Sequence, residues 1–543
     1  MATDSSSPDS PRDMNRREAI RLGSGAVALG AMGSLFGLPL LEGCSPTAEG
    51  PPNILFIFSD DHACQAISAY GSRINRTPNI DRIAHEGALF ENSFCTNAIC
   101  APSRAVVLTG KFSHVNGKID NRADPFDTSQ ATFNKALQAA GYETAMIGKW
   151  HLRNDPEGFD YWKVLPGQGH YYNPDFRAPQ GPDGTVVTEQ IEGYVTDIIT
   201  DLSLDWLEKG RDPRKPFLLM CQHKAPHRNW MPGPDHLRSF EEEEIPEPET
   251  LFDDYAGRAN PASQQEMSIA RDFFPAYDLK ITPPNPENEQ DEEYWTWVYD
   301  RMTPEQKRLW DQVYDPRNEA FREAAPQGDE RTRYFYQRYI KDYLRCVASV
   351  DDSIGRILDY LDESGLAGNT LIVYSSDQGF FLGEHGWYDK RWMYEESLRM
   401  PFVARWPARI PAGIRVPEMI QNIDYAPTFL AAAGLVVPEE IQGESLIPLM
   451  EGEPPAEWRQ SIYYHYYEFP AEHMVAKHYG VRTDRFKLIH YYETDEWECF
   501  DLEMDPSVID SVYGDPAYAD VVASLKVELH RLRALYGDTD QVA

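Results

Sequence analysis

The stretch from Cys100 to Arg104 contains residue types that can form a nucleophilic site. It reads Cys-Ala-Pro-Ser-Arg and continues with Ala-Val-Val-Leu-Thr-Gly-Lys. A cysteine can act as a covalent nucleophile, and a helix starting beside it would add backbone N–H groups that favour an anion. The alternative is a buried structural cysteine in front of a helix that begins with proline, which is common. Motifs elsewhere in the chain are needed to choose between these two interpretations.

Acidic and amide side chains directly follow two predicted strands, 53–58 and 370–374; they are Asp60, Asp61, Asp377 and Gln378. In an open parallel sheet, ligands bind at the carboxyl ends of the strands, so these four side chains can converge. Three carboxylates and an amide oxygen suit a hard divalent cation such as calcium. The alternative is that the aspartates cap helices or turns.

Cationic side chains occur in three further motifs. Lys149 and His151 belong to Gly-Lys-Trp-His-Leu after a predicted strand at 144–148, His227 ends Ala-Pro-His, and Lys390 ends Gly-Glu-His-Gly-Trp-Tyr-Asp-Lys. A lysine after a strand is usually solvated, and a lone histidine is more often structural than catalytic. Each motif alone is therefore a weak indication of a catalytic site. The three motifs indicate one only in combination with the stretch at Cys100.

Taken together, these motifs resemble the type I sulfatases of the alkaline phosphatase-like superfamily. In that family the cysteine, here Cys100, is oxidised after synthesis to formylglycine (3-oxoalanine) by a maturation enzyme. One hydroxyl of the aldehyde hydrate attacks sulfur, and the other later expels sulfate. The resemblance implies an α/β fold with a large wound, mostly parallel sheet flanked by helices.

The resemblance also implies roles for individual residues. One calcium ion would be held by Asp60, Asp61, the formylglycine at position 100, Asp377 and Gln378. The family commonly has Asn or His where this chain has Gln378, whose arm is one methylene longer. The sulfate transition state needs fixed cations in a water-poor site, and the resemblance supplies them as Arg104, Lys149, His151, His227 and Lys390.

Two stretches are similar to one branch of the family. They are 222–232, which contains His227, and 467–474, which contains His473. Both resemble sulfatases that act on 6-O-sulfated N-acetylglucosamine in glycosaminoglycans. The resemblances to the family and to this branch together imply that Lys149, His227, Lys390 and His473 bind the substrate.

The order of predicted elements indicates two domains after residue 50. Short apolar strands at 53–58, 144–148, 217–220 and 370–374 alternate with helices such as 191–209 and 334–361, as in a wound α/β sheet. This catalytic domain spans 51–454. It contains an acidic, proline-rich insert at about 241–330, mostly loop with a helix at 303–325, for which a role as a lid stays open. A smaller α+β domain follows at 455–543, with strands at 462–467 and 486–492 and a helix at 518–536.

The first 44 residues resemble a twin-arginine export signal. Arg16 and Arg17 precede an uncharged run, Leu22–Leu41, that is rich in glycine and alanine. The alternative is that this run forms a membrane-spanning helix. The glycines and Pro39 of the run argue against such a helix. Residues 41–44 resemble a lipoprotein cleavage site, which leaves lipid attachment at Cys44 open. We expect export to the periplasm or the outer cell surface.

Composition excludes nucleic acid as a partner. The chain has 51 basic and 87 acidic residues, a net charge of −36, which is opposite to what phosphate binding requires. Seven cysteines without ligand-like spacing argue against a disulfide framework or a zinc finger.

Three functions remain open from the sequence. The first is an exported sulfatase acting on a sugar. The second is a phosphonate or phosphodiester hydrolase of the same fold, and the third is a non-catalytic glycan-binding lipoprotein in which Cys100 stays a thiol.

Overall fold

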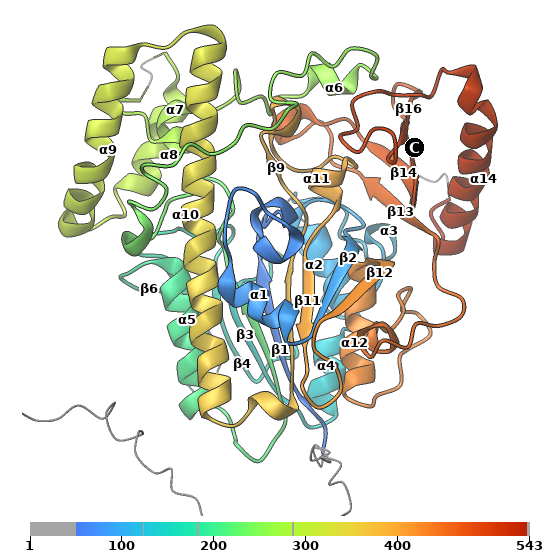
Figure 1. Cartoon of the computed structure of the whole chain (residues 1–543). Helices are drawn as coiled ribbons and strands as arrows, with labels where there is room; N and C mark the ends of the chain where they lie inside the picture. The colour runs from blue at the N-terminus through green and yellow to red at the C-terminus, as the bar shows by residue number, and fades with distance from the viewer. Residues whose placement is uncertain (1–49, 123, 182–183, 285–286, 540–543) are drawn as a thin grey trace, which may run out of the picture. The chain divides into compact units, whose positions relative to one another are not determined.

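Ten strands form the central sheet of the computed structural model, which describes residues 50–122, 124–181, 184–284 and 287–539. The middle of the sheet is parallel: β1 (Asn53–Ser59) lies between β8 (Thr370–Ser376) and β7 (Phe217–Gln222), and β7 also pairs with β3 (Glu143–Lys149). These strands are almost continuously apolar because both faces of a central parallel strand are covered. The predicted wound, mostly parallel α/β sheet is confirmed (Figure 1).

The edges of the sheet are mixed. The strand order is β12-β2-β11-β8-β1-β7-β3-β4-β5-β6. The strand β11 is antiparallel to both of its neighbours, and β5 is antiparallel to both β4 and β6. The bounds of these outer strands are β2 (Ala88–Phe94), β4 (Tyr161–Leu165), β5 (Asp175–Gln180), β6 (Thr185–Gln190), β11 (Phe402–Arg405) and β12 (Ile414–Gln421).

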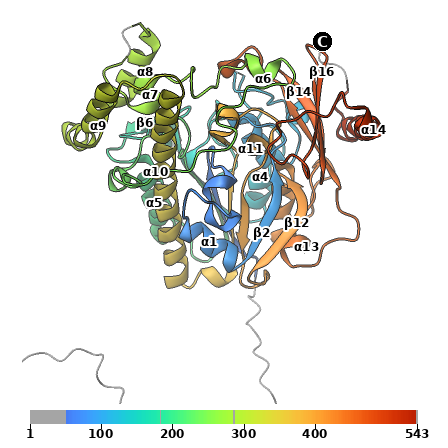
Figure 2. The ribbon, with the colours of Figure 1, turned by 45° about the horizontal axis from the view of Figure 1, so that its top comes forward.

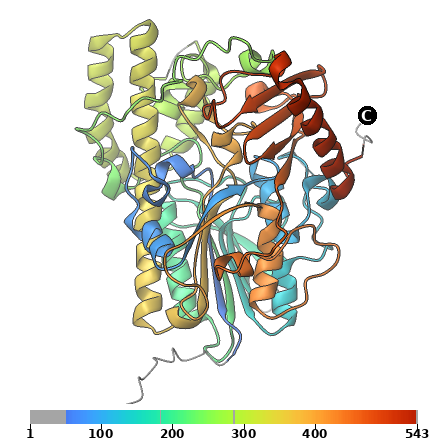
Figure 3. The same cartoon turned by 45° about the vertical axis from the view of Figure 1, so that its right-hand side comes forward.

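Helices cover both faces of the sheet (Figures 1 and 3). One group contains the contacting helices α1 (Pro78–His85), α5 (Val195–Asp205) and α10 (Gly328–Glu363). The other contains α2 (Cys100–Thr109), α4 (Phe133–Ala139) and α12 (Tyr425–Ala432). Short elements complete the chain: α3 (Ser113–Asn116), α11 (Glu395–Leu398), α13 (Ile447–Met450), β9 (Phe381–Leu382) and β10 (Tyr388–Asp389).

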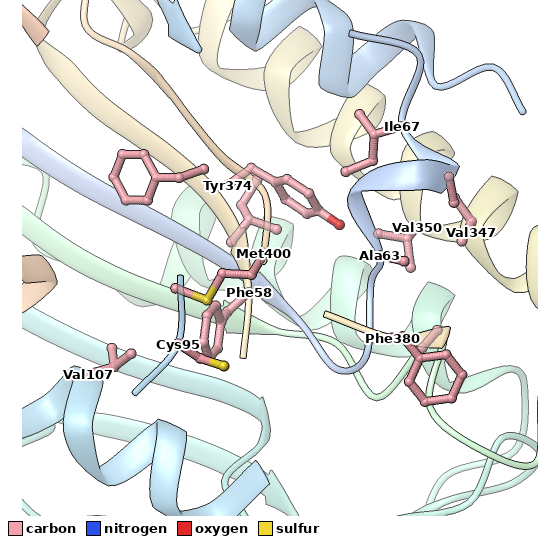
Figure 4. Close-up of a cluster of buried hydrophobic side chains, with 14 of the residues drawn as sticks. Phe58, Ala63, Ile67, Cys95, Val107, Val347, Val350, Tyr374, Phe380 and Met400 are labelled. Carbon is pink, nitrogen blue, oxygen red and sulfur yellow. The ribbon is translucent and has the colours of Figure 1, made fainter. Parts of the chain in front are cut away.

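Part of the core lies near the carboxyl ends of β1 and β8. Figure 4 shows Phe58 and Tyr374 from these strands, with Val107 of α2 and Val347 of α10 among the surrounding side chains. All four are at most 1% exposed. Burying one such side chain stabilises the folded state by about 1.5–3 kcal/mol. This packing therefore holds the ends of β1 and β8 in place.

The acidic insert is more ordered than its sequence indicates. The predicted helix at 303–325 is present as α9 (Pro304–Ala324), with Thr303 and Gln306 forming a capping box. Three further helices were not predicted: α6 (Pro261–Gln264), α7 (Pro275–Leu279) and α8 (Glu289–Tyr299).

The C-terminal region forms a separate four-stranded antiparallel sheet. It consists of β13 (Ser461–Tyr466), β14 (His478–Thr483), β15 (Phe486–Tyr491) and β16 (Glu496–Asp501), against which α14 (Ala519–Tyr536) packs. Figures 1 and 2 place this sheet and helices α7–α9 on opposite sides of the molecule, at the end where the parallel strands finish.

The predicted export signal and Cys44 lie outside the described residues. Among the residues that are described, no helix is long and apolar enough to cross a membrane. The six cysteines that the structure describes are all unpaired and buried, in agreement with the absence of a disulfide framework predicted from their spacing.

Candidate active site

The ends of three central strands and the start of one helix bring most of the predicted site residues together. Asp60 and Asp61 follow β1, Asp377 and Gln378 follow β8, Lys149 ends β3, and Cys100 is the first residue of α2. Asp61 and Gln378 are 317 positions apart in sequence, yet their side chains are in hydrogen-bond contact. The convergence follows from the parallel pairing of β1 with β7 and β8.

Cys100 is fully buried at the start of α2. Its Sγ lies 3.3 Å from Asp60 Oδ1 and 3.9 Å from Gln378 Nε2. Burial raises the pKa of the thiol to about 12, with Lys390 lowering it and Asp377 raising it further. Because the thiolate is the reactive form of cysteine, an unmodified Cys100 would be a poor nucleophile at neutral pH.

Three buried carboxylates form a compact cluster. Oxygen atoms of Asp60, Asp61 and Asp377 all lie within 4.8 Å of one another, and none of the three residues is exposed. Burial raises the pKa of Asp61 to about 7; Lys390 lowers it, and Asp377 raises it again. Like charges this close are unfavourable unless a cation compensates them.

Gln378 can complete an all-oxygen ligand set. Its Nε2 donates a hydrogen bond to Asp61 Oδ1 at 2.5 Å, while its buried Oε1 has no partner in the described part of the chain. A half-turn of the amide exchanges the two atoms, which would bring the oxygen to the carboxylate cluster. Three carboxylates and one carbonyl oxygen fit a hard divalent cation such as calcium.

Each carboxylate of the cluster also contacts a cationic side chain. Lys149 forms an ion pair with Asp60, and Lys390 Nζ donates to Asp61 Oδ2 at 2.6 Å. Arg104 donates to Asp377 Oδ2 from Nε at 3.2 Å and from Nη2 at 3.0 Å. The three cations are at most 3% exposed, so cationic side chains and carboxylates are buried together inside a strongly acidic protein.

The two predicted catalytic histidines are held in the neutral form. Burial and the nearby Lys149 keep the pKa of both His151 and His227 well below the usual range. His227 Nδ1 donates to the Arg228 carbonyl at 2.7 Å, so its Nε2 carries the lone pair and lies 3.7 Å from Asp61 Oδ2. A bound anion would favour protonation of this nitrogen.

His473 lies beside the cluster rather than within it. Its Nε2 is 3.2 Å from Asp389 Oδ2, and its Nδ1 donates to the Glu266 carbonyl at 2.6 Å. Asp389 directly precedes Lys390 and also pairs with Arg391. The predicted contact of His473 with substrate stays a prediction.

Sequence reasoning missed two polar side chains of the site, Gln222 and Lys224. Gln222 Oε1 accepts a hydrogen bond from Arg104 Nη1 at 2.6 Å. Lys224 is 3% exposed, lies 4.7 Å above the ring of Tyr171 and has no carboxylate partner among the residues described. Burial lowers the pKa of Lys224 to about 8, although Asp61 raises it. Their position was the available signal: Gln222 ends β7 and Lys224 follows it, as His227 does.

A cleft of about 750 Å³ opens beside these groups. His151 and Gln168 line it together with Arg153 and Glu472. Gln168 Oε1 accepts a hydrogen bond from Lys149 Nζ, so one wall of the cleft is in direct contact with a lysine of the site.

Comparison with known proteins decides the family. The family model described as Sulfatase matches residues 52–435, and that described as N-sulphoglucosamine sulphohydrolase, C-terminal, matches 383–535. The chain belongs to the sulfatase family. This sulfatase is therefore a sulfuric ester hydrolase, as its motifs predicted.

The relatives of this sulfatase cover nearly its whole length. An N-acetylglucosamine-6-O-sulfatase of Bacteroides thetaiotaomicron is 49% identical over 90% of this chain and 87% of that protein. An arylsulfatase of Clostridium perfringens is 25% identical over 88% and 93%. The solved structure of BT4656 in complex with its substrate D-glucosamine-2-N,6-O-disulfate has a TM-score of 0.86 and 49% identity, and covers 90% of this chain and 99% of that one.

Proposed function

We propose that this sulfatase removes the 6-O-sulfate from N-acetylglucosamine or a closely related glucosamine unit of a glycosaminoglycan. The observation that carries the proposal is the buried pocket in which Lys149, Lys390 and Arg104 surround Cys100 and three carboxylates. The 49% identity to an N-acetylglucosamine-6-O-sulfatase supports the choice of sugar.

The nucleophile of this reaction is formylglycine, formed from Cys100 by a maturation enzyme. The raised pKa of the thiol supports this, because a protonated thiol cannot attack sulfur effectively. As a hydrated aldehyde, formylglycine supplies two hydroxyls on one carbon, one to attack sulfur and one whose deprotonation expels sulfate.

The cofactor is a calcium ion held by Asp60, Asp61, Asp377, Gln378 and the residue at position 100. The mutual proximity of the carboxylates and the unpartnered Oε1 of Gln378 support this ligand set within the described residues. When bound, such a cation acts as a Lewis acid on the sulfate ester.

The surrounding side chains bind the sulfate and manage protons. Lys149, Lys390 and His227 bind the peripheral oxygens, where charge concentrates in the transition state. Arg104 holds Asp377 and lies close to the nucleophile. His227 protonates the leaving sugar oxygen through Nε2, since its Nδ1 is fixed on a backbone carbonyl. His151 serves the later release of sulfate from the nucleophile.

Removing the metal is expected to remove activity. Replacing Asp377 or Asp61 by Ala should remove the bound calcium. It should also lower kcat by at least about 100-fold, because the ion polarises the ester. Chelation should inhibit the unchanged enzyme, and calcium should restore the rate better than zinc, since the ligands are all oxygens. Metal content by elemental analysis and sulfate release are the measurements. Full activity in fully demetallated protein would contradict the assignment.

Export and domain organisation belong to the same proposal. The paired Arg16 and Arg17 ahead of an apolar run support a twin-arginine signal, with Cys44 as a candidate lipid attachment site. The catalytic domain spans 51–454 and the C-terminal domain 455–543, a division supported by the separate sheet β13–β16. By contacts, both belong to one compact unit, Pro46–Ala543.

A substrate panel tests the proposal. It contains 6-, 3- and 2-O-sulfated or N-sulfated glucosamines, an aryl sulfate and a phosphonate monoester, and it is scored by released sulfate or phosphonate. We expect 6-O-sulfated N-acetylglucosamine or its N-sulfated analogue to react fastest. A faster reaction with another sulfated position, or with the phosphonate, would overturn the assignment.

A further inference from the structure

The cleft beside the active site contains one cationic side chain with no anionic partner. Arg153 lines the cleft two positions after His151, is exposed, and forms no ion pair with any described residue. The other arginine on the cleft wall, Arg177, donates to both carboxylate oxygens of Asp155, at 2.8 and 3.0 Å. Only Arg153 is therefore left to meet an incoming anion in the described part of the cleft.

Arg153 is positioned by the segment that also caps the nucleophile's helix. Its Nη2 donates to the carbonyl of Asn121 at 2.9 Å. The side-chain Oδ1 of Asn121 accepts a hydrogen bond at 3.0 Å from the backbone N–H of Ala101, the second residue of α2. Asn121 thus joins the guanidinium to the first turn of α2, which begins at Cys100.

The acidic surface of the protein makes an unpaired cation in the cleft important for binding an anionic substrate. With a net charge of −36, the surface repels anionic glycans at long range, so an anion at the cleft needs local compensation. The two acidic residues on the cleft wall are already paired: Glu472 with Arg228 at 2.7 Å, and Asp155 with Arg177. An arginine binds sulfate or carboxylate oxygens in a two-pronged geometry that lysine cannot match.

From these observations we propose that Arg153 binds a second anionic group of the substrate glycan, a sulfate or carboxylate separate from the sulfate that is removed. The cleft then selects glycosaminoglycan units with two anionic groups over singly sulfated sugars. This inference rests on the proposed function, because it names a further feature of that function's substrate.

Three probes test the inference and separate the sources of the anion. They are N-acetylglucosamine-6-sulfate, glucosamine-2-N,6-O-disulfate, and N-acetylglucosamine-6-sulfate linked through C1 to glucuronic acid. We expect Arg153→Gln to lower the ratio of kcat/KM for a doubly anionic probe to that for the singly sulfated sugar about fivefold, mostly through KM. Fivefold corresponds to about 1 kcal/mol. The doubly anionic probe whose kcat/KM ratio falls in Arg153→Gln identifies the anion that Arg153 binds, either the N-sulfate or the carboxylate.

Arg122→Gln is the matched control. Arg122 is half-exposed, pairs with Asp120 at 3.7 Å and does not line the cleft, so its loss removes the same charge and should leave the ratio unchanged. Arg153→Lys should keep part of the preference. An equal loss for all three probes, or the same ratio change in Arg122→Gln, would overturn the inference.

A binding measurement separates this inference from the proposed function. Calorimetry with Cys100→Ala protein, with and without Arg153→Gln, needs no turnover. Tighter binding of a doubly anionic probe that disappears with Arg153→Gln supports the inference even if sulfate is not released. Release of sulfate by the enzyme with equal binding of all probes would leave the function intact and refute the role of Arg153.

Discussion

Replacing Cys100 by alanine is expected to abolish turnover of every sulfate ester, a loss on the order of 10⁴–10⁶-fold. In the proposed mechanism this residue supplies the group that forms the covalent bond to sulfur. The fold should survive, because alanine fits the buried first turn of the helix. Sulfate release and circular dichroism measure the two effects.

Replacing Cys100 by serine separates attack from release. A serine hydroxyl can form a sulfate ester but lacks the second hydroxyl on the same carbon, so at most one slow turnover should leave sulfate on the enzyme. Intact mass should show the addition of one sulfate. Cys499→Ala, which changes a buried cysteine of the C-terminal sheet, is the control and should keep activity.

Two outcomes would contradict the role of Cys100. Sustained turnover by either variant would refute the formylglycine assignment. An unconverted thiol at position 100 in active protein purified from its native host would do the same, and peptide mass spectrometry detects it directly.

Replacing His227 by alanine is expected to damage the hydrolysis of sulfated sugars far more than that of aryl sulfates. A sugar alkoxide is a poor leaving group and needs a proton, and a well-placed general acid contributes about 10²–10⁴-fold. A nitrophenolate leaves almost without help. The ratio of kcat/KM for a 6-O-sulfated sugar to that for nitrophenyl sulfate should therefore fall by about 100-fold or more.

The geometry explains how His227 could act as the acid. Its Nδ1 hydrogen bonds to the Arg228 carbonyl, which leaves Nε2 to carry the transferred proton. Burial and neighbouring lysines hold the pKa of the free side chain well below the usual range, and the negative charge of bound sulfate opposes this. Proton uptake is thereby linked to substrate binding.

His151→Ala provides the comparison. Because His151 is assigned to the release of sulfate from the nucleophile, its loss should slow both substrates alike. If His227→Ala also slows both substrates by the same factor, His227 is only a sulfate-binding group and the acid lies elsewhere.

The sequence alone determined the features that depend on neighbouring residues. The central strands were predicted from short apolar runs, because strands covered on both faces need apolar side chains along their whole length. The helix starts at Cys100 and at about Thr303 were likewise predicted from a few adjacent positions. The motifs around Cys100, Lys149 and His227 also sufficed for the family.

The short helices of the acidic insert could not be predicted in this way. The first turn of α7 is capped by Asp291, whose Oδ1 accepts hydrogen bonds from the backbone N–H groups of Ala276 at 2.9 Å and Tyr277 at 3.0 Å. Asp291 belongs to α8 and is fully buried. The cap of α7 therefore comes from a residue in a different helix, which no pattern within α7 itself reveals.

Only the tertiary structure decided which charges meet. Lys390 and Asp61 are 329 positions apart, yet they form a buried hydrogen bond at 2.6 Å, and His473 faces Asp389 rather than the carboxylate cluster. Lys224 and Arg153 are left without carboxylate partners in the described chain, although lysine and arginine are usually solvated or paired. The strength of an interaction between charges depends on their distance and burial, and here both are set by where the strand ends converge.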